Sequence, residues 1–383
     1  MRMNRIITCI ALLFSAMIGM AQAGNGKLQI HHIDMGQGDA AVLISPSGKV
    51  VIFDAGRDMS SKKDCAVQTD YLEQLGVRQI DYIFVSHLHT DHIGCIPAVL
   101  EKFPLVTAAY DRGGQYASGY YTRYAASVGT KRKTAQLGQM VELEANAKKV
   151  TLKVVSLNGT YNGGQVSTEN ENDLSVAVLV SFGAFREEIG GDLSGEHTST
   201  YEDIESGVAP SVGSLDVYKV HHHCSSHSSN GLWLKTTAPT VAIISTGDGN
   251  SYRHPTEDCL SRLHEAEISK VYWTERGAGA EPKVNDVIAG DVSIEVEPNA
   301  QRYLVTYGSG TGTVDTYKIK AAGDITNTDA RATTSRYAWS ERSQFYHYSD
   351  CAAVKRISPG NLRSGNDPPP GKRPSTCITQ AAP

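Results

Sequence analysis

The sequence predicts an α/β fold in which layers of β-strands are joined by a small number of helices. Two groups of short apolar runs, rich in β-branched residues and separated by turn residues, predict strands in both halves of the chain. Segments with helical spacing lie between them. At 383 residues, the chain is long enough for one large domain with an appendage. Its formal net charge of −5 excludes a generally basic surface for nucleic acid.

The first 23 residues are typical of a secretory signal peptide. A positively charged start precedes a mostly apolar run at 6–20, and "AQA" at 21–23 matches an A-x-A cleavage site. The run is shorter than the roughly 20 residues of a membrane-spanning helix. We therefore expect a mature chain that begins near Gly24, has no transmembrane domain and is periplasmic or secreted. A retained N-terminal anchor is the alternative.

In the first half, the predicted strands are 28–34, 40–45, 50–56 and 80–86. The segment from Val67 to Leu75 has helical spacing and is followed by Gly76, a helix stop. A second predicted helix runs from Ile96 to Phe103, with a proline in its first turn.

In the second half, the predicted strands are 148–157, 174–182, 215–220 and 240–246, and 254–266 predicts a helix. We expect the two halves to form one domain over residues 24–300. A predicted β-hairpin at 302–321 and a polar linker at 326–335 place a β extension and linker at 301–340. The tail, 341–383, has few aliphatic residues, so we expect it to be stapled or partly disordered rather than independently packed.

Cysteine usage agrees with export. Beyond the leader an even number remains: Cys65, Cys95, Cys224, Cys259, Cys351 and Cys377. An even count in an exported chain favours disulfides, and the sequence leaves their pairing open. The spacing is too irregular for a zinc site built of Cys-x-x-Cys pairs.

The segment "FVSHLHTDHIG", residues 84–94, carries the candidate metal ligands His87, His89, Asp91 and His92. A turn after the preceding strand can aim alternate side chains at one point, so that His87 and His89 share one metal while Asp91 and His92 reach another. Imidazole and carboxylate ligands without thiolate suit zinc, with manganese or iron as competitors. Four ligand-type residues in six positions indicate a metal site.

Several segments together resemble the metallo-β-lactamase superfamily, and in particular the hydrolase domain of ComEC-type competence proteins. They follow the family's order from His31 to Pro255: "HHIDMGQGDAAVLISPSGKVVIFDAG", "SHLHTDHIG", "ENDLSVAVLV", "IGGDLSG", "DVYKVHHHCSSHSS" and "GNSYRHP". The resemblance implies an αββα sandwich with the metal site at one edge of two packed sheets. A small extension containing β-structure and cysteines would follow it at the C-terminus.

The resemblance also implies two divalent metals, with zinc the first choice and manganese or iron as alternatives. His87 and His89 would bind the first metal. Asp91 and His92 would bind the second, and Asp192 in "GGD" would bridge both.

The remaining ligand positions rest on the same resemblance. A histidine of "KVHHHCSS" would complete the second metal, and both His222 and His223 match. Asp54 would orient a ligand histidine, with a turn or cap role as the alternative. Many superfamily members bind the first metal through a third histidine, yet residues 93–191 contain none. Asn172 or Asp173 occupies the expected place, and we take Asp173 as the substitute ligand, with a turn role as the alternative.

The implied reaction is hydrolysis, because two divalent metals lower the pKa of a shared water toward about 7 and stabilise the developing oxyanion. Asp91 would hold this water and pass on its proton. His254 in "YRHP" would contact a phosphate oxygen, with a structural role as the alternative. A bridging carboxylate favours a phosphodiester substrate such as DNA. The competing functions are a cell-envelope phosphocholine or small-ester hydrolase and a non-catalytic exported module that binds nucleic acid.

The loop from Tyr110 to Lys133 mixes tyrosines with basic residues. Such a mixture can stack bases and pair with phosphates, which makes Arg123, Lys131, Arg132 and Lys133 candidate substrate-binding residues. An ordinary solvated loop with a half-buried helix is the alternative.

The tail resembles a small two-cysteine module at the ends of some extracellular nucleases. Its landmarks are Tyr346, His347, Cys351, Asn361 and Cys377. The resemblance implies a disulfide between Cys351 and Cys377, worth about 3 kcal/mol on the loop-entropy account.

Overall fold

The structure of the protein is a computed structural model. It describes residues 24–57, 65–144, 149–308, 312–320, 337–340, 343–348, 354, 362–365 and 369–375. The predicted signal peptide, the linker at 326–335 and the Cys351–Cys377 pairing lie outside the described residues and stay predictions. In the described ranges, every helix is too short or too polar to cross a lipid bilayer.

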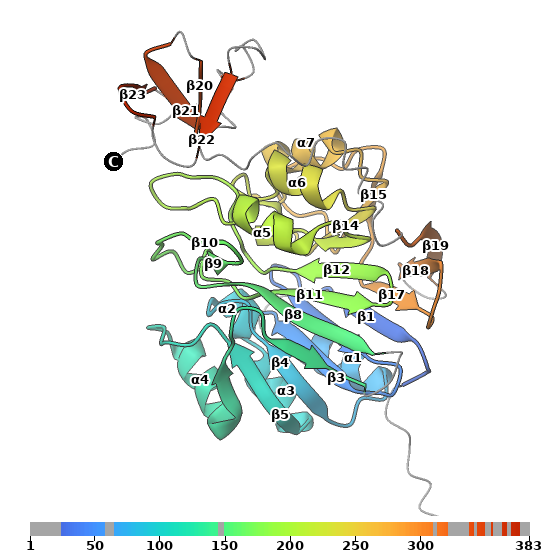
Figure 1. Ribbon diagram of the computed structural model, residues 1–383. Coiled ribbons are helices and arrows are strands. Elements are labelled where there is room, and N and C mark those ends of the chain that lie inside the picture. The colour runs from blue at the N-terminus through green and yellow to red at the C-terminus, as the bar shows by residue number, and fades with distance from the viewer. Residues whose placement is uncertain are drawn as a thin grey trace, which may run out of the picture.

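Two β-sheets pack face to face, with helices on both outer faces, and form the αββα sandwich that the sequence predicted (Figure 1). In the described part of the chain, neighbouring strands of the first sheet follow the order β19-β18-β17-β1-β2-β3-β4-β5-β6. Its strands are β1 (Leu28–His32), β2 (Ala40–Ile44), β3 (Val50–Ala55), β4 (Ile80–Phe84), β5 (Leu105–Asp111), β6 (Arg132–Thr134), β17 (Val292–Val296), β18 (Arg302–Tyr307) and β19 (Thr313–Lys318).

The second sheet has the order β10-β9-β8-β11-β12-β13-β14-β15-β16 over the described residues, and β7 pairs with β8. Its strands are β7 (Met140–Glu142), β8 (Val150–Leu157), β9 (Thr160–Tyr161), β10 (Gly164–Gln165), β11 (Ala177–Phe182), β12 (Phe185–Ile189), β13 (Val217–Lys219), β14 (Val241–Ile244), β15 (Lys270–Trp273) and β16 (Asp286–Ile288).

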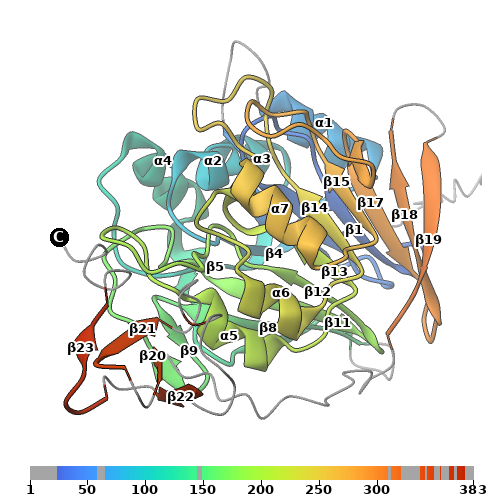
Figure 2. The ribbon, with the colours of Figure 1, turned by 90° about the horizontal axis from the view of Figure 1, so that it is seen from above.

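The helices divide between the two outer faces. Figure 2 shows α5, α6 and α7 lying over the second sheet, while α1 to α4 belong to the first. The helices are α1 (Ala66–Gln74), α2 (Thr90–Ile93), α3 (Ile96–Lys102), α4 (Gly119–Val128), α5 (Glu205–Val212), α6 (Gly231–Thr237) and α7 (Glu257–Glu265), with short 3-10 turns η1 (Gly129–Lys131) and η2 (His221–Cys224). The predicted helices therefore correspond to α1, α3 and α7.

Three apolar clusters hold these layers together. One fills the space between the sheets, where the rings of Phe53 and Phe84 stack at 5.8 Å. A second lies under the helices of the first sheet and includes Val99. The third lies under α5, α6 and α7 and includes Trp233. The β-branched runs that predicted the strands supply most of the residues between the sheets, because such residues pack well on pleated surfaces.

Strand β12 escaped sequence prediction because it carries two buried carboxylates. Glu187 and Glu188 are fully buried and interrupt its apolar pattern. Each has a histidine partner: Glu187 lies 2.7 Å from His32 and Glu188 lies 3.1 Å from His221. Buried charge of this kind persists only when it is paired, and the sequence does not reveal the partners.

Parallel pairing gathers several strand ends at one edge of the sandwich. In the first sheet β3, β4 and β5 run parallel, and in the second sheet β12, β13, β14 and β15 do so. Loops at the carboxyl ends of such strands are the usual place for ligand sites in α/β proteins. Loops from both sheets meet at this edge.

The C-terminal part contains the predicted hairpin and a separate small sheet. Strands β18 and β19 pair antiparallel, and β18 also pairs with β17, so the hairpin extends the first sheet. The described tail segments form a sheet of order β22-β20-β21-β23. Its strands are β20 (Tyr337–Ser340), β21 (Phe345–Tyr348), β22 (Leu362–Gly365) and β23 (Arg373–Pro374).

The prediction of disulfides is confirmed. Cys65 bonds to Cys95, which joins the start of α1 to the start of α3. Cys224 bonds to Cys259, which joins the turn after β13 to α7. Both bonds tie segments that leave the carboxyl edge to a helix on the outer face.

Candidate metal centre

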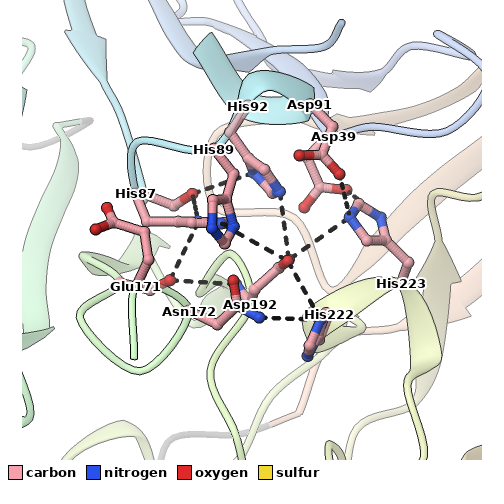
Figure 3. Close-up of polar contacts among 12 residues, drawn as sticks. Asp39, His87, His89, Asp91, His92, Glu171, Asn172, Asp192, His222 and His223 are labelled. Atoms are coloured by element: carbon pink, nitrogen blue, oxygen red, sulfur yellow. Dashed lines mark hydrogen bonds and ion pairs between the residues drawn. The ribbon is translucent and has the colours of Figure 1, made fainter. Parts of the chain in front are cut away.

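The loop after β4 brings the predicted ligands to the carboxyl edge (Figure 3). The chain leaves β4 at Phe84 and enters the short helix α2, with His89 at its N-cap in an extended conformation. His87 and His92 are fully buried, and their ring centroids lie 4.1 Å apart. His89 Nδ1 lies 3.0 Å from His87 Nε2. Asp91 follows in the first turn of α2, so the loop and helix present all four side chains together.

Asp54 near the end of β3 fixes the orientation of His92. Its Oδ1 accepts the backbone N–H of Ser86 at 2.8 Å, and its Oδ2 accepts the Ser86 hydroxyl at 2.6 Å. The Nδ1–H of His92 donates to Oδ2 at 2.8 Å. Because Nδ1 is engaged, Nε2 of His92 faces the cluster. This is the contact that the resemblance implied for Asp54.

A glycine turn after β12 delivers Asp192 to the same place. Gly191 has φ +60°, and a Cβ there would collide with Ser86. Its carbonyl accepts the backbone N–H of His222 at 3.0 Å. Asp192 is 3% exposed. Glycine is therefore required where the two sheets' loops approach each other closely.

The three consecutive histidines after β13 point in different directions. His221 lies between two buried carboxylates, 2.8 Å from Glu205 and 3.1 Å from Glu188, away from the cluster. His222 and His223 have φ of 50° and 53°, a left-handed conformation that non-glycine residues adopt only when surrounding contacts impose it. This turn directs both of them toward Asp192.

The two oxygens of Asp192 face two different sets of imidazoles. Oδ2 lies 3.7 Å from Nε2 of both His87 and His222. Oδ1 lies 3.4 Å from His92 Nε2 and 3.7 Å from His223 Nε2. Among the described residues, three groups have ligand atoms that all lie within 4.8 Å of one another: His87, His92 and Asp192; Asp91, His92 and His223; and Asp39, Asp54 and His92.

The group of Asp91, His92 and His223, together with Asp192, fits a divalent cation. Among the described residues, three buried polar atoms that face each other here have no hydrogen-bond partner: His92 Nε2, Asp192 Oδ1 and His223 Nε2. Asp91 Oδ2 lies 3.5 Å from His223 Nε2. Ligand atoms that share one tetrahedral Zn²⁺ at about 2.1 Å lie about 3.4 Å from each other. The spacing in this cluster matches that value.

Neighbouring carboxylates raise the pKa of two imidazoles in the cluster. Burial lowers the pKa of His92, but Asp192 and Asp54 outweigh it and raise the pKa well above its usual value. Burial likewise opposes protonation of His223, but Asp192 and neighbouring carboxylates raise its pKa to about 10. Metal ligands must be deprotonated, so metal binding would release these protons.

Sequence reasoning missed Asp39 and Lys219. Asp39 Oδ1 lies 2.8 Å from Lys219 Nζ and 3.4 Å from His223 Nδ1. The His223 Nδ1–H donates to the Ser245 carbonyl at 2.9 Å. These contacts fix His223 much as Asp54 fixes His92. Asp39 directly follows "GQG" in a segment that is part of the family resemblance, and this position could have indicated its role.

Asp173, the predicted substitute ligand, makes its described hydrogen bonds away from the histidine cluster. Its Oδ2 accepts the Thr168 hydroxyl at 3.0 Å and the backbone N–H of Glu202 at 2.9 Å, so it holds two loops together. No candidate metal group among the described residues includes it. The neighbouring Asn172 reaches the cluster instead, with Nδ2 3.1 Å from His222 Nε2. Adjacent residues of a turn point in different directions, and only the fold decides which one faces inward.

His254 lies beside the cluster. Its ring centroid is 5.6 Å from that of His222 and 6.0 Å from that of His223. It is 7% exposed, and its Nδ1 has no hydrogen-bond partner among the described residues. Burial lowers its pKa to about 3, with His223 and His222 adding to the effect. The contact of His254 with a phosphate oxygen stays a prediction.

The basic loop is used differently from the prediction. Arg132 pairs with buried Asp111 at 2.6 Å, and Lys131 donates to the Leu105 carbonyl. Arg123 stacks over a neighbouring tyrosine ring at 4.4 Å. Arg132, Lys131 and Arg123 therefore contact residues of β5 and α4. Lys133 lies exposed on β6. In the described structure none of the four contacts the histidine cluster.

Two other residues connect that loop to the cluster. The ring of Tyr116 lies 5.6 Å from that of His89. Glu171 accepts the backbone N–H of Leu88 at 2.8 Å and pairs with Arg112 at 2.6 Å. Sequence reasoning named neither contact, because both join segments that are far apart in the chain.

Comparison with known proteins gives three kinds of match. The metallo-beta-lactamase superfamily profile matches residues 34–232. Recombination protein 2 of Haemophilus influenzae is 25% identical over 256 residues, which cover 67% of this chain and 29% of that protein. ComE operon protein 3 of Bacillus subtilis is 24% identical over 285 residues, 70% of this chain and 34% of that protein. The chain thus spans about a third of the length of these curated relatives.

Two solved structures are similar to part of the chain at low identity. The metallo-beta-lactamase fold protein YhfI from Bacillus subtilis has a TM-score of 0.40 and 12% identity, and the match covers 67% of this chain and 99% of that one. A metallo-beta-lactamase from Cronobacter sakazakii has a TM-score of 0.32 and 19% identity, with 51% and 70% covered.

Proposed function

Because the chain belongs to the metallo-β-lactamase superfamily, we propose that it is an exported metal-dependent hydrolase that cleaves phosphodiesters such as DNA. The observation that carries the proposal is the Asp192 carboxylate, whose two oxygens face separate sets of buried imidazoles. A carboxylate in this position can bridge two cations, as two-metal phosphoester hydrolysis requires. Zinc is the first choice, with manganese or iron as alternatives.

The ligand sets follow from the two sides of Asp192. The first metal would be held by His87, His89, His222 and Asp192, and the second by Asp91, His92, His223 and Asp192. His222 would then take the place of the third histidine that is absent between residues 93 and 191. Bound metals would supply Lewis acidity and lower the pKa of a water.

The side chains have separate tasks in this reaction. Asp91, whose pKa His223 and His92 hold below its usual range despite burial, would orient the attacking water and accept its proton. His254 would contact a phosphate oxygen from the Tyr252 side of the cluster. Asp54 and Asp39 would keep His92 and His223 oriented.

The choice of a nucleic-acid phosphodiester has two supports. Recombination protein 2, one of the relatives, is named for recombination, which is a process of DNA. The ring of Tyr116 beside His89 offers a half-exposed aromatic face on which a base could stack. Export is supported by the Cys65–Cys95 and Cys224–Cys259 disulfides, which are typical of oxidising compartments.

Metal-dependent turnover tests the proposal. Purified protein loaded with Zn²⁺ or Mn²⁺ is offered bis-p-nitrophenyl phosphate, single-stranded DNA, p-nitrophenyl phosphocholine and nitrocefin. We expect hydrolysis of the first two, loss of activity with a chelator, and a fall of about 100-fold or more in Asp192→Asn, because one carboxylate serves both cations.

A matched variant controls for the loss of a carboxylate. Asp70→Asn on α1 removes an exposed aspartate, whose side chain is 60% accessible, and should retain full activity. Turnover of p-nitrophenyl phosphocholine alone would replace the proposal by the small-ester hydrolase. DNA binding without hydrolysis of any substrate would replace it by the binding module.

A further inference from the structure

A cavity lies next to the metal cluster, and its lining residues take no part in the proposed ligation. It has a volume of about 370 Å³, within the roughly 300–1,000 Å³ range of small-molecule sites. We call it the Tyr252 pocket. Its lining includes Met35, Arg57, Asp248, Asn250, Tyr252 and Glu275. The turn before β2 and the loop after β14 form its two walls.

The Tyr252 pocket shares a wall with the cluster. The ring of Tyr252 lies 5.8 Å from that of His254 at an angle of 24°, and the ring of His254 lies 6.0 Å from that of His223 at the same angle. On the other side, a Cβ added to Gly38 would be 2.7 Å from the Asp91 carbonyl. A substrate held at the cluster therefore has this pocket as its nearest neighbour on the His254 side.

The chemistry of the pocket fits a flat, neutral group that carries N–H donors. Tyr252 is 57% exposed, so one face of its ring is open for stacking. The Asp248 backbone N–H donates to the Glu275 carboxylate at 2.5 Å, and the Gly277 backbone N–H donates to Asp248 at 3.1 Å. A carboxylate offers about four acceptor positions, so both can also accept from a ligand. The carboxylates of Asp248 and Glu275 disfavour an anionic group placed directly beside them.

Arg57 also lines the pocket and adds a positive charge to it. Its guanidinium has five donors and suits a phosphate oxygen. Glycines at 36 and 249 add no side chain to the lining, so a planar ring can approach the backbone there. A nucleotide presents these features together: a flat base, amino donors on its edge, and a phosphate at one end.

We propose that the Tyr252 pocket is a base subsite, which holds the nucleobase next to the scissile phosphodiester and prefers bases that carry an exocyclic amino group. The inference rests on the proposed function and deepens it. Tyr252 stacks on the base, Asp248 and Glu275 accept its amino N–H groups, and Arg57 contacts the adjoining phosphate. Cytosine is therefore held better than thymine, which has no amino group.

Kinetics on matched substrates test the subsite. The ratio of kcat/KM for oligo(dC) to that for bis-p-nitrophenyl phosphate, which has no base, should fall roughly 5- to 150-fold in Tyr252→Ala. Tyr252→Phe keeps the stacking face and should keep the ratio. Asp248→Ala should reduce the preference for oligo(dC) over oligo(dT), because only Glu275 then remains to accept the amino N–H groups. Phe345→Ala, which truncates an aromatic side chain that is 47% exposed in the tail sheet, controls for loss of an exposed ring.

Binding separates the failure of the subsite from the failure of the proposed function. If no phosphodiester is hydrolysed, the function fails, and the pocket is judged by titrating the metal-loaded protein with deoxycytidine and thymidine monophosphates. Tighter binding of the cytidine nucleotide, weakened roughly 5- to 150-fold by Tyr252→Ala, supports the subsite. Equal affinity for both nucleotides, absence of binding, or an unchanged Tyr252→Ala variant overturns it.

Discussion

Two carboxylates that are not assigned to a metal determine how two histidines face the cluster. Asp54 engages Nδ1 of His92, and Asp39 lies 3.4 Å from Nδ1 of His223. In both cases Nε2 is left facing Asp192. Because an imidazole has two nitrogens, a ligand histidine is defined only when its other nitrogen is held.

Replacing Asp54 with asparagine should weaken metal binding. Asn keeps the shape and tolerates the left-handed φ of 52° at this position, but it removes the charge that fixes the His92 tautomer. We expect metal affinity to fall by about 10- to 100-fold, which is the usual effect of losing a contact that orients a ligand histidine. Competition with a chromophoric chelator measures the affinity. An Asp54→Asn protein that binds metal as tightly as Asp70→Asn would contradict the assignment.

His31 gives a pH dependence that lies outside the metal cluster. Burial lowers its pKa to about 4, with His32 adding to the effect, whereas in the unfolded chain it titrates near about 6.5. Between these values the unfolded state binds the proton and the folded state does not. The stability that neutral His31 contributes is therefore fully present above a pH of about 6.5 and is lost as the pH falls toward about 4.

His31→Gln should remove this component. From neutral pH down to about pH 4, the free energy of unfolding should fall by about 2–3 kcal/mol more in the natural protein than in the variant. Urea unfolding at a series of pH values measures the difference. Parallel pH profiles for the two proteins would show that His31 is not titrated on unfolding.

The turn η2 after β13 depends on contacts from other parts of the fold. Its left-handed residues His222 and His223 are anchored on one side by His221 between two glutamates and on the other by the Cys224–Cys259 disulfide. Outside this fold, three consecutive histidines would not adopt the left-handed conformation, because it is unfavourable for residues other than glycine. Helix α7, through Cys259, thus helps to hold the metal-facing side chains.

Removing the Cys224–Cys259 bond should destabilise the fold. The bond links residues 35 apart in sequence, for which the loop-entropy account gives about 4 kcal/mol and measured bonds usually give about 2–4 kcal/mol. We expect the Cys224→Ser/Cys259→Ser protein to lose stability in this range in urea unfolding. Full stability in the double variant would mean that the turn is held by the glutamate pairs alone.

Across the molecule, the candidate centre joins the two sheets. His87, Asp91 and His92 come from the loop after β4 of the first sheet, while Asp192 and His223 come from loops of the second. Buried pairs Lys219–Asp39 and His32–Glu187 cross between the same sheets. A cation bound here would act as one more link across the sandwich.

Metal removal should therefore lower the thermal stability of the whole domain. With metal at about 100 times its Kd, binding adds about 2.7 kcal/mol, which for a chain of this size raises Tm by about 3–5 °C. Scanning calorimetry with and without chelator measures the shift. Asp192→Asn should show a much smaller one, and an equal shift in both proteins would place the metal elsewhere.

The pattern of the sequence predicted β1 to β4, β8, β11, β13, β14 and the hairpin of β18 and β19, together with three of the helices and the ligand-type residues after β4. These features depend on local pattern, such as apolar periodicity and a short run of imidazoles and carboxylates. β12 was missed because its buried Glu187 and Glu188 resemble surface residues until their histidine partners are known.

Which side chains face the cluster depends on contacts made in the folded molecule. The fold selected His222 and His223 over His221, Asn172 over Asp173, and added Asp39. In a turn, successive side chains diverge, and their directions are set by contacts with segments distant in the chain, such as the Gly191 carbonyl that holds His222. Such long-range contacts leave no periodic trace in the sequence, which is why the ligands were recognisable by type but not by orientation.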